Sequence, residues 1–156
     1  MVQSLNLPQY SFRIKTERQR KYIFDNIRKR YVVLTPEEWV RQNLVTWLVR
    51  EKGYPLSLIA VEMPLRVNRM ERRADIILFS KQGTPAVIVE CKAPSIKISQ
   101  KVFDQAARYN IDLKVEYLIV SNGMDHYCAR LDHKGGSWQF LSEVPGFDVI
   151  NCGNGG

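Results

Sequence analysis

Two short segments in the middle of the chain have apolar residues at both odd and even positions, and they constrain the fold more than any other feature. Ala74 to Phe79 and Ala86 to Cys91 each have the length of a β-strand, and strands of this kind are covered on both faces. The residues between them, Ser80 to Pro85, contain Gly and Pro and suit a short turn. The sequence therefore predicts an antiparallel hairpin that other elements cover on both sides.

The clearest helix is expected to begin after Thr35. Thr is a common N-cap, Pro36 suits the first helical position, and Glu38 follows Thr35 by three residues, which is the arrangement of a capping box. Gly53 suits the end of this helix. The apolar stripe that would pack against the sheet consists of Val40, Leu44, Trp47 and Leu48.

The rest of the chain alternates strands with one more helix. A strand is predicted from Leu58 to Leu65, and a helix from Ile98 to Asn110. The hairpin signal Asn122-Gly123 predicts that the following strand runs antiparallel to the one before it. The last three expected strands are Val115 to Val120, Tyr127 to Leu131 and Trp138 to Leu141. This order predicts an α/β fold with a mixed central sheet covered by helices.

Length and composition fit one compact domain. The chain has 156 residues, of which 45% are apolar and 25% charged. We expect residues 35–150 to form the core domain, residues 1–34 to add a small hairpin packed on it, and residues 151–156 to be a flexible tail. Three widely spaced cysteines indicate neither a disulfide scaffold nor a cysteine-based zinc site. With no long apolar run and no signal-peptide pattern, we expect a cytoplasmic protein without a membrane partner.

Positive charge is concentrated at the beginning of the chain. Residues 1–34 hold eight basic and two acidic residues, a net +6, whereas the other 122 residues hold 15 basic and 14 acidic residues, a net +1. A local positive field favours a polyanion partner, so nucleic acid is one hypothesis. A solvated face that only improves solubility is the alternative.

The predicted central hairpin contains few charges. If Leu78 to Ser80 pairs with Ala86 and Val87, Asp75 lies opposite Glu90 or its neighbours, and alternation places Glu90 and Lys92 on one face. Two adjacent carboxylates repel each other and lose hydration unless a cation neutralises them. The sequence therefore predicts a site for a hard divalent cation, Mg²⁺ by ligand type.

The spacing of these residues resembles a known superfamily of nucleases. Asp75 followed by Glu90-Cys91-Lys92 is similar to the PD-(D/E)XK motif, in which one strand carries an acid and the next an acid-x-Lys. Ala74 stands where the motif nominally has Pro, at a position that varies widely. Five segments in order resemble, more narrowly, the N-terminal domain of type I restriction enzyme restriction subunits: Thr35 to Gln42, Arg72 to Asp75, Glu90 to Pro94, Gln105 to Tyr109 and Ser121 to Gly123.

The resemblance implies a restriction-endonuclease-like core with an extra N-terminal hairpin and C-terminal strands. It also implies a Mg²⁺-dependent DNA endonuclease, with Mn²⁺ able to substitute, that takes part in restriction-modification. DNA and separate motor or specificity subunits would be its partners, while a homodimer and the choice between DNA and RNA are left open.

Phosphodiester hydrolysis assigns a role to each residue of the motif. Asp75 and Glu90 would bind the metal directly, with the main-chain carbonyl of Cys91 as a third ligand. Lys92 would act as a point charge on the attacking water or the phosphate. The resemblance implies a further acid on the first helix, where Glu37 and Glu38 compete. Helical geometry places Glu37 nearer the sheet, and Glu38 fits the capping box, so Glu37 is favoured.

Other residues are candidates for contacts with the substrate. Gln105, which the resemblance assigns to catalysis, and Tyr109 lie four residues apart on one helical face, where both could act on a phosphate or on Lys92. The basic residues expected to contact nucleic acid are Arg72, Arg73, Lys21, Arg28 and Arg30.

Each candidate also has a purely structural interpretation. Lys92 could only pair with Asp75 or Glu90, Tyr109 could pack in the core with Gln105 exposed, and Arg72 and Arg73 could be a solvated strand end. His126 and His133 are interpreted as incidental surface residues.

Three functions follow from these alternatives. The first is the Mg²⁺-dependent endonuclease, acting alone or as a module for partner proteins. The second is a non-catalytic nucleic-acid-binding or assembly module on the same fold. The third is a structural domain with no nucleic-acid partner.

Overall fold

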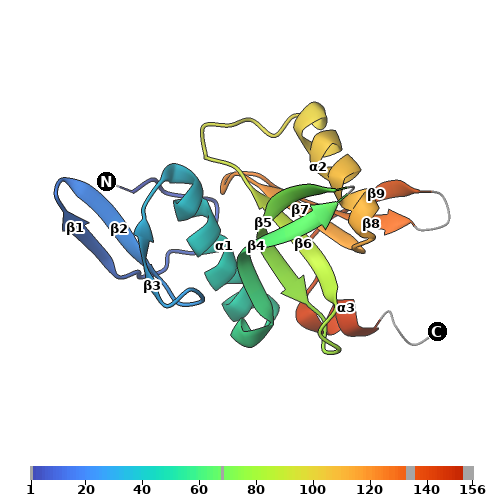
Figure 1. The fold of residues 1–156 in the computed structure, drawn as a ribbon, viewed down its shortest axis with the longest axis horizontal. Helices are drawn as coiled ribbons and strands as arrows, with labels where there is room; N and C mark the ends of the chain where they lie inside the picture. Colours follow the sequence, from blue (N-terminus) through green and yellow to red (C-terminus); the bar gives the residue numbers. More distant parts are fainter. Residues whose placement is uncertain (1, 68, 133–135, 153–156) are drawn as a thin grey trace.

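The structure is a computed structural model that describes residues 2–67, 69–132 and 136–152. Within these residues, six strands form a central sheet in the order β4-β5-β6-β7-β8-β9 (Figure 1). Neighbouring strands are antiparallel except β6 and β7, which are parallel, so the sheet is mixed as predicted. The strands are β4 (Ile59–Val67), β5 (Met70–Phe79), β6 (Pro85–Cys91), β7 (Tyr117–Ser121), β8 (His126–Asp132) and β9 (Ser137–Leu141).

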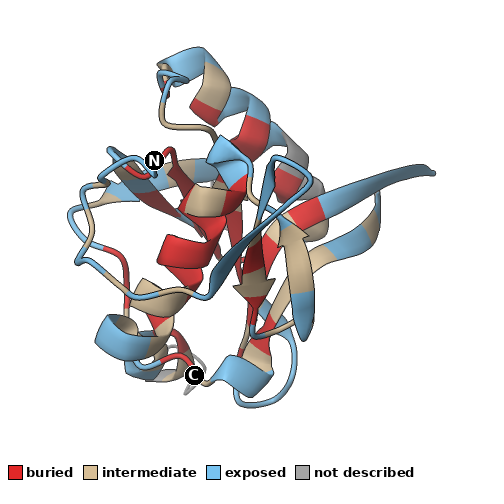
Figure 2. Ribbon diagram, turned by 90° about the vertical axis from the view of Figure 1, so that its left-hand side faces the viewer, coloured by how far each residue is buried: buried red, intermediate tan, exposed pale blue. Residues whose placement is uncertain are grey.

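The predicted hairpin is β5 and β6, and it lies inside the sheet rather than at its edge. Ile76 pairs with Val89, and Ile77 with Ile88. Ile76 and Val89 belong to the hydrophobic cluster under α1 (Pro36–Lys52), while Ile77 and Ile88 belong to the cluster under α2 (Gln100–Leu113). Figure 2 shows the buried residues concentrated where these layers meet. Both faces of the hairpin are therefore covered, as its apolar sequence required.

Half of the predicted capping box forms at the start of α1. The Thr35 hydroxyl accepts a hydrogen bond from the Glu38 backbone N–H at 3.0 Å. The Thr35 N–H, however, donates to the carbonyl of Val33 and not to the Glu38 side chain, which has other partners described below. Gly53 ends the helix as predicted. Gly53 has a φ of 76°, and its backbone N–H points back to the last turn of the helix.

Two helix boundaries differ from the sequence prediction. α2 begins at Gln100 and continues to Leu113, so it starts and ends later than expected. A further helix, α3 (Phe147–Cys152), extends two residues into the segment expected to be a tail, and the Asn151 side chain accepts the Lys81 N–H at 3.0 Å. Helix ends depend on such tertiary contacts, which periodicity does not report. None of the helices in the described part of the chain is long and apolar enough to span a bilayer.

The N-terminal region forms a small sheet, not the single hairpin expected. Within residues 2–67, β1 (Ile14–Glu17), β2 (Arg20–Asp25) and β3 (Arg30–Val33) pair antiparallel in that order. Arg18 and Gln19 connect β1 to β2 with positive φ at both residues, which is a hairpin turn without its usual Asn or Gly. The sequence therefore lacked the signal that would have delimited these strands.

The N-terminal stretch contacts the turn between β7 and β8. The Asn6 N–H donates to the carbonyl of Gly123 at 2.9 Å. Gly123 has a φ of +85°, and a Cβ there would lie 2.8 Å from Leu5 Cδ2 and 3.1 Å from Val40 Cγ2. Both the turn and the close approach require glycine at this position.

We predict that Gly123→Ala destabilises the protein more than Gly83→Ala does. Both glycines have positive φ, so each substitution incurs about 1–2 kcal/mol of backbone strain. Only Gly123 is crowded, and displacing Leu5 and Val40 adds about 1 kcal/mol or more. Urea unfolding of the two variants measures this difference, and equal losses would show that Leu5 moves aside without cost.

Candidate functional site

Asp75 and Glu90 meet where β5 and β6 lie side by side. They are the next residues beyond the pair Ile76 and Val89 in the antiparallel register. The backbone N–H of Cys91 donates to Asp75 Oδ2 at 2.8 Å, which fixes the Asp75 carboxylate against β6. Each of the two acidic side chains is 19% exposed, so both are largely withdrawn from water yet remain accessible.

Three cationic side chains surround these two carboxylates. Lys92 Nζ lies 3.3 Å from Glu90 Oε1, and Arg72 Nη2 lies 3.5 Å from the same oxygen. Arg41 Nη1, which comes from α1, lies 3.7 Å from Asp75 Oδ1. The structure thus brings Asp75, Glu90, Lys92 and Arg72 together, and it adds Arg41, which the sequence analysis did not include.

The Asp75 carboxyl group holds its proton more tightly than an ordinary aspartic acid does. Its pKa is raised from 3.8 to about 6, mainly by burial, and the charges of Glu37 and Glu90 contribute in the same direction. The hydrogen bond from Cys91 and the charge of Arg41 lower this pKa and so limit the rise. A second cation beside Asp75 would stabilise its ionised form.

Glu38, not Glu37, is the buried acid of the first helix, contrary to the helical-wheel argument. Glu38 is 5% exposed, and its Oε1 accepts hydrogen bonds from Arg41 at 2.8 Å and Arg28 at 2.7 Å. Burial alone would raise the pKa of Glu38, but these hydrogen bonds lower it below its usual value. Glu37 is exposed, and its charge acts on Asp75.

The helical-wheel prediction for Glu37 and Glu38 was wrong because it assumed that only one face of α1 is covered. Figure 1 shows α1 between the small N-terminal sheet and the central sheet, so the helix is covered on two sides. Arg28, from the β2–β3 connection, reaches Glu38 across the second side. The choice of Glu37 as a metal ligand remains a prediction, whereas the assignment of Glu38 to the capping box is corrected.

A buried chain of ion pairs links the N-terminal sheet to the site. Arg28 bonds both Asp25, at 2.7 Å, and Glu38, while Arg41 bonds both Glu38 and Glu62. Glu62 lies on β4 between residues that pair with β5 on either side of Asp75. The sequence contained one indication of these ion pairs, because Glu38 and Arg41 are three residues apart on one helix and such residues can pair.

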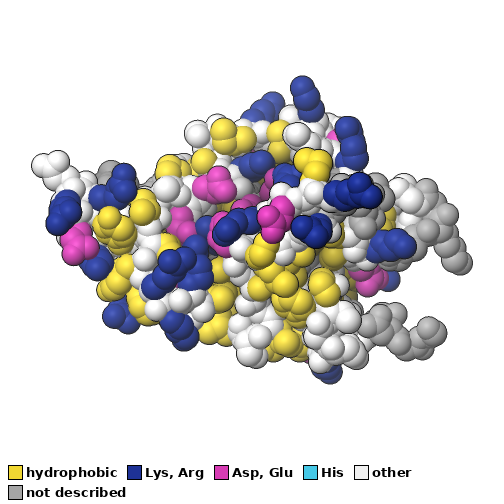
Figure 3. Space-filling view, viewed as in Figure 1, with side chains coloured by type: hydrophobic (Ala, Val, Ile, Leu, Met, Phe, Trp, Pro, Cys, Tyr) yellow, Lys and Arg dark blue, Asp and Glu magenta, His cyan; other side chains and the backbone are white. Residues whose placement is uncertain are grey.

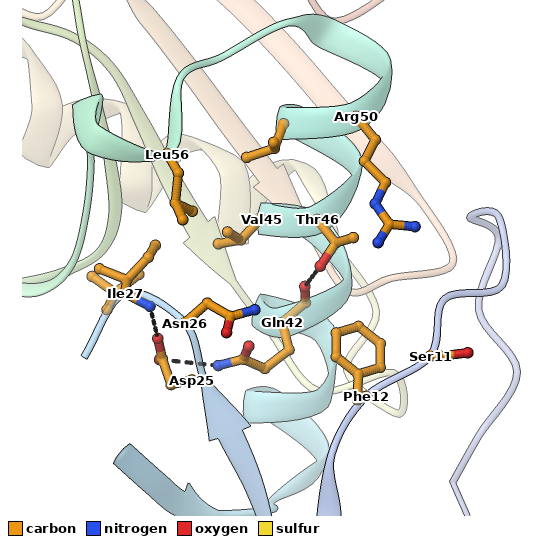
Figure 4. A pocket seen from close by; sticks show the side chains of 12 residues that line it. Ser11, Phe12, Asp25, Asn26, Ile27, Gln42, Val45, Thr46, Arg50 and Leu56 are labelled. Atoms are coloured by element: carbon orange, nitrogen blue, oxygen red, sulfur yellow. Dashed lines mark hydrogen bonds between the residues drawn. The ribbon is translucent and has the colours of Figure 1, made fainter. Parts of the chain in front are cut away.

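Gln42 secures the same chain of ion pairs from α1. Its side-chain amide donates to Asp25 Oδ2 at 3.0 Å and to Glu38 Oε2 at 3.2 Å. Figure 4 shows Gln42 and Asp25 in a cavity of about 220 Å³ between α1 and the N-terminal segment. None of the predicted site residues lines this cavity.

The other predicted contact residues are more scattered. Arg28 is committed to Asp25 and Glu38, with 17% of its side chain exposed, which removes it from the proposed nucleic-acid surface. Lys21, Arg30 and Arg73 are exposed on β2, β3 and β5. Gln105 is exposed on α2, and the side chain of Tyr109 lies outside the described residues.

The two histidines also differ in what the structure shows. His126 is not an incidental surface residue, because Nδ1 lies 2.7 Å from the Ser121 hydroxyl and Nε2 lies 2.9 Å from the Asn6 carbonyl. It ties the N-terminal stretch to β7 and β8. His133 lies outside the described residues.

The donor atoms at the site suit a hard cation, although the protein supplies few of them. Within the described ranges, no group of three or more His, Cys, Asp or Glu side chains could hold a metal ion. The carboxylates of Asp75 and Glu90 and the main-chain carbonyl of Cys91 are oxygen donors of the kind that Mg²⁺ prefers, and Mg²⁺ retains several waters. The Cys91 thiol is buried, and burial raises its pKa well above the usual value.

Comparison with known proteins connects this geometry to a family. The family model described as type I restriction enzyme R protein N terminus matches residues 36–145. The chain belongs to this family. The matched residues include α1, the β5–β6 hairpin and α2, so they contain the whole candidate site.

One solved structure supports the same assignment. It is a fragment of a protein assigned as the HsdR subunit of a type I restriction enzyme from Vibrio vulnificus YJ016. The match has a TM-score of 0.55 and 25% sequence identity over 75% of this chain. The chain spans 24% of the length of that structure. No curated protein matches the sequence.

We predict that Asp75→Asn stabilises the protein at pH 7.5 in EDTA. The folded-state pKa of Asp75 lies above the unfolded value, so the folded state binds the proton more tightly, and stability falls as pH rises from about 4 to about 6. Removing the charge recovers up to about 3 kcal/mol above pH 6 and nothing near pH 4.

Urea unfolding across this pH range measures the effect. Asp125→Asn is the control, because Asp125 is exposed in the β7–β8 turn. If Asp75→Asn is less stable than the wild type at pH 7.5, the contact with Arg41 outweighs the burial of the carboxylate.

Proposed function

We propose that this chain is a nuclease module of a type I restriction system, which hydrolyses DNA phosphodiester bonds with Mg²⁺. The observation that carries the proposal is the position of Asp75, Glu90 and Lys92 at one point of the central sheet, in a chain of the R-protein N-terminal family. Mn²⁺ is expected to substitute, because it accepts the same oxygen ligands.

Asp75 and Glu90 would hold the metal through their carboxylates, with the Cys91 carbonyl as a further donor. A bound Mg²⁺ supplies Lewis acidity toward the phosphate and lowers the pKa of a coordinated water. The Cys91 N–H and Arg41 keep the Asp75 carboxylate oriented, and Arg41 favours its ionised form.

Among the described residues, Lys92 is one of two accessible cations at the site, and the motif assigns it the role of acting on the substrate. The Lys92 side chain is 34% exposed, and its ammonium group stays at the site because it pairs with Glu90 Oε1 at 3.3 Å. A positive point charge there stabilises the negative charge that gathers on the phosphate in the transition state. Arg72, also beside Glu90, would hold the same phosphate or its neighbour.

DNA would approach along the basic N-terminal region. Lys21 and Arg30 are exposed there, and residues 1–34 carry a net +6. Motor and specificity subunits of a restriction system are the proposed protein partners and would supply recognition and movement along DNA. Gln105 and Tyr109 remain proposed contacts from α2.

A second function is supported by the ion pairs at the site. Arg41, Arg72 and Lys92 already balance the charges of Asp75 and Glu90. The fold therefore does not require a metal for electrostatic balance. A non-catalytic nucleic-acid-binding or assembly module has to be stable without a metal, so these ion pairs fit that function. Measurements of metal binding and cleavage separate the two functions.

We expect Mg²⁺ and Mn²⁺ to raise the melting temperature relative to EDTA. A cation that binds only the folded state stabilises it by mass action, by about 2.7 kcal/mol at one hundred times its Kd. Glu90→Gln should lose this metal effect, whereas Asp125→Asn should retain it. Coincident wild-type curves in EDTA, Mg²⁺ and Mn²⁺ at millimolar metal would favour the non-catalytic module.

Lys92→Ala is predicted to separate binding from chemistry. Its affinity for DNA should stay within a few-fold of the wild type, while Mg²⁺-dependent cleavage falls by about 100-fold or more, because Lys92 acts mainly in the transition state. Gel-shift and nicking assays measure the two effects. Lys101→Ala, an exposed lysine on α2, is the control and should leave both unchanged.

Replacing Lys21 and Arg30 should have the opposite profile. Affinity should weaken about equally for all sequences, and the salt dependence should become shallower by about one counterion per lost phosphate contact. If the wild type binds DNA but does not cut it with Mg²⁺ or Mn²⁺, the non-catalytic function replaces the nuclease. Absence of binding at low salt would refute the nuclease and the nucleic-acid-binding form of the second function, which leaves the assembly module.

A further inference from the structure

The outward face of the small N-terminal sheet carries aromatic side chains in adjacent positions. Ile23 of β2 is fully buried on the side of α1, so its neighbours Tyr22 and Phe24 point to the other side. Tyr31 of β3 lies directly opposite Phe24. The rings of Phe24 and Tyr31 are 5.3 Å apart in an edge-to-face arrangement, and all three rings are only half-buried.

Two basic side chains lie over these rings, one from the adjoining edge strand β1 and one from the residue that precedes it. The Arg13 guanidinium is 4.4 Å from the centre of the Phe24 ring, and Lys15 Nζ is 4.4 Å from the centre of the Tyr31 ring. Both cations are exposed. Figure 3 shows hydrophobic and basic side chains intermixed over the end of the molecule where Figure 1 places β1 to β3.

The contacts on this face are weak enough to be exchanged. A cation over an aromatic ring at an exposed site contributes about 0.5–1 kcal/mol. Stacking of a nucleic-acid base on an aromatic ring contributes about 1–3 kcal/mol per base. A nucleic-acid strand has both bases and phosphates. Its bases would therefore stack on the ring faces, and its phosphates would pair with the cations that the bases displace.

The geometry points to a platform for single-stranded nucleic acid on this face. Bases would stack on Tyr22, Phe24 and Tyr31, and phosphates would pair with Arg13 and Lys15. The net +6 of residues 1–34 matches the charge of such a ligand. A duplex keeps its bases stacked inside, so the rings select the single strand. The inference rests on the nucleic-acid part of the proposed function, not on metal chemistry.

A cavity lies beside this face, between the small sheet and the segment that follows β6. It has a volume of about 670 Å³ and is lined by Arg20, Lys21 and Val33 of the small sheet and by Pro94. Val33 lies opposite Tyr22, and Pro94 follows Lys92 by two residues.

Competition binding to the full chain tests the platform. A labelled oligothymidylate is bound in EDTA and displaced with unlabelled oligothymidylate, with an abasic strand of the same length, or with a duplex of the same length. For the wild type, the thymidylate strand should compete about ten-fold or more better than the abasic strand, because about 1.4 kcal/mol of stacking gives a factor of ten.

Variants locate the effect on this face. Phe24→Leu combined with Tyr22→Leu and Tyr31→Leu should make the thymidylate and abasic strands equal competitors, while circular dichroism confirms that the sheet remains folded. Tyr127→Leu, which changes an aromatic residue exposed on β8, should retain the wild-type preference. If the thymidylate and abasic strands compete equally for the wild-type protein, the platform is overturned. This outcome can be measured without any variant.

The outcome is independent of the nuclease. If the stacking preference is present but Mg²⁺ gives no cleavage, the platform stands and the proposed enzymatic function fails. If duplex DNA is cleaved but the preference is absent, the nuclease stands and the platform fails.

Discussion

The structure depends on the Arg41 guanidinium, which holds three elements together through buried charge. Arg41 is 7% exposed and contacts Glu38 on its own helix, Glu62 on β4 and Asp75 on β5. A buried carboxylate without a partner costs several kcal/mol, so these acids and Arg41 stabilise the fold only as a set. Arg28 extends the set to the N-terminal sheet by pairing with both Asp25 and Glu38.

This arrangement explains why Asp75 is both structural and chemically unusual. Its carboxylate is tied to β6 by the Cys91 N–H and faces Arg41, yet burial and the nearby charges of Glu37 and Glu90 keep its pKa high. A group in such a balance responds strongly to one additional charge. The proposed metal chemistry and the alternative, a carboxylate held by ion pairs alone, both start from this balance, and they differ in whether a second cation joins Arg41.

The central part of the site was largely predictable because it depends on two local rules. Strand alternation and the short β5–β6 connection were enough to place Asp75 beside Glu90 and Lys92 beside Glu90. The acid on α1 was less predictable, since burial of Glu38 arises from Arg28, which arrives from another sheet. Arg41 had one local signal, its spacing from Glu38, and Glu62 had none; their pairing, and that of Arg41 with Asp75, follow from the folded chain.

By itself, the sequence determined the elements whose signals are local: the doubly covered hairpin, the capped start of α1 at Thr35, its end at Gly53, and the turn at Asn122-Gly123. Tertiary structure alone decided the third strand of the N-terminal sheet, the partners of Glu38, Arg28 and His126, and the extent of α3. The physical reason is the distance along the sequence over which each kind of interaction acts. Periodicity and capping report forces between residues close in sequence, whereas the choice of a buried charge's partner depends on segments that only the folded chain brings together.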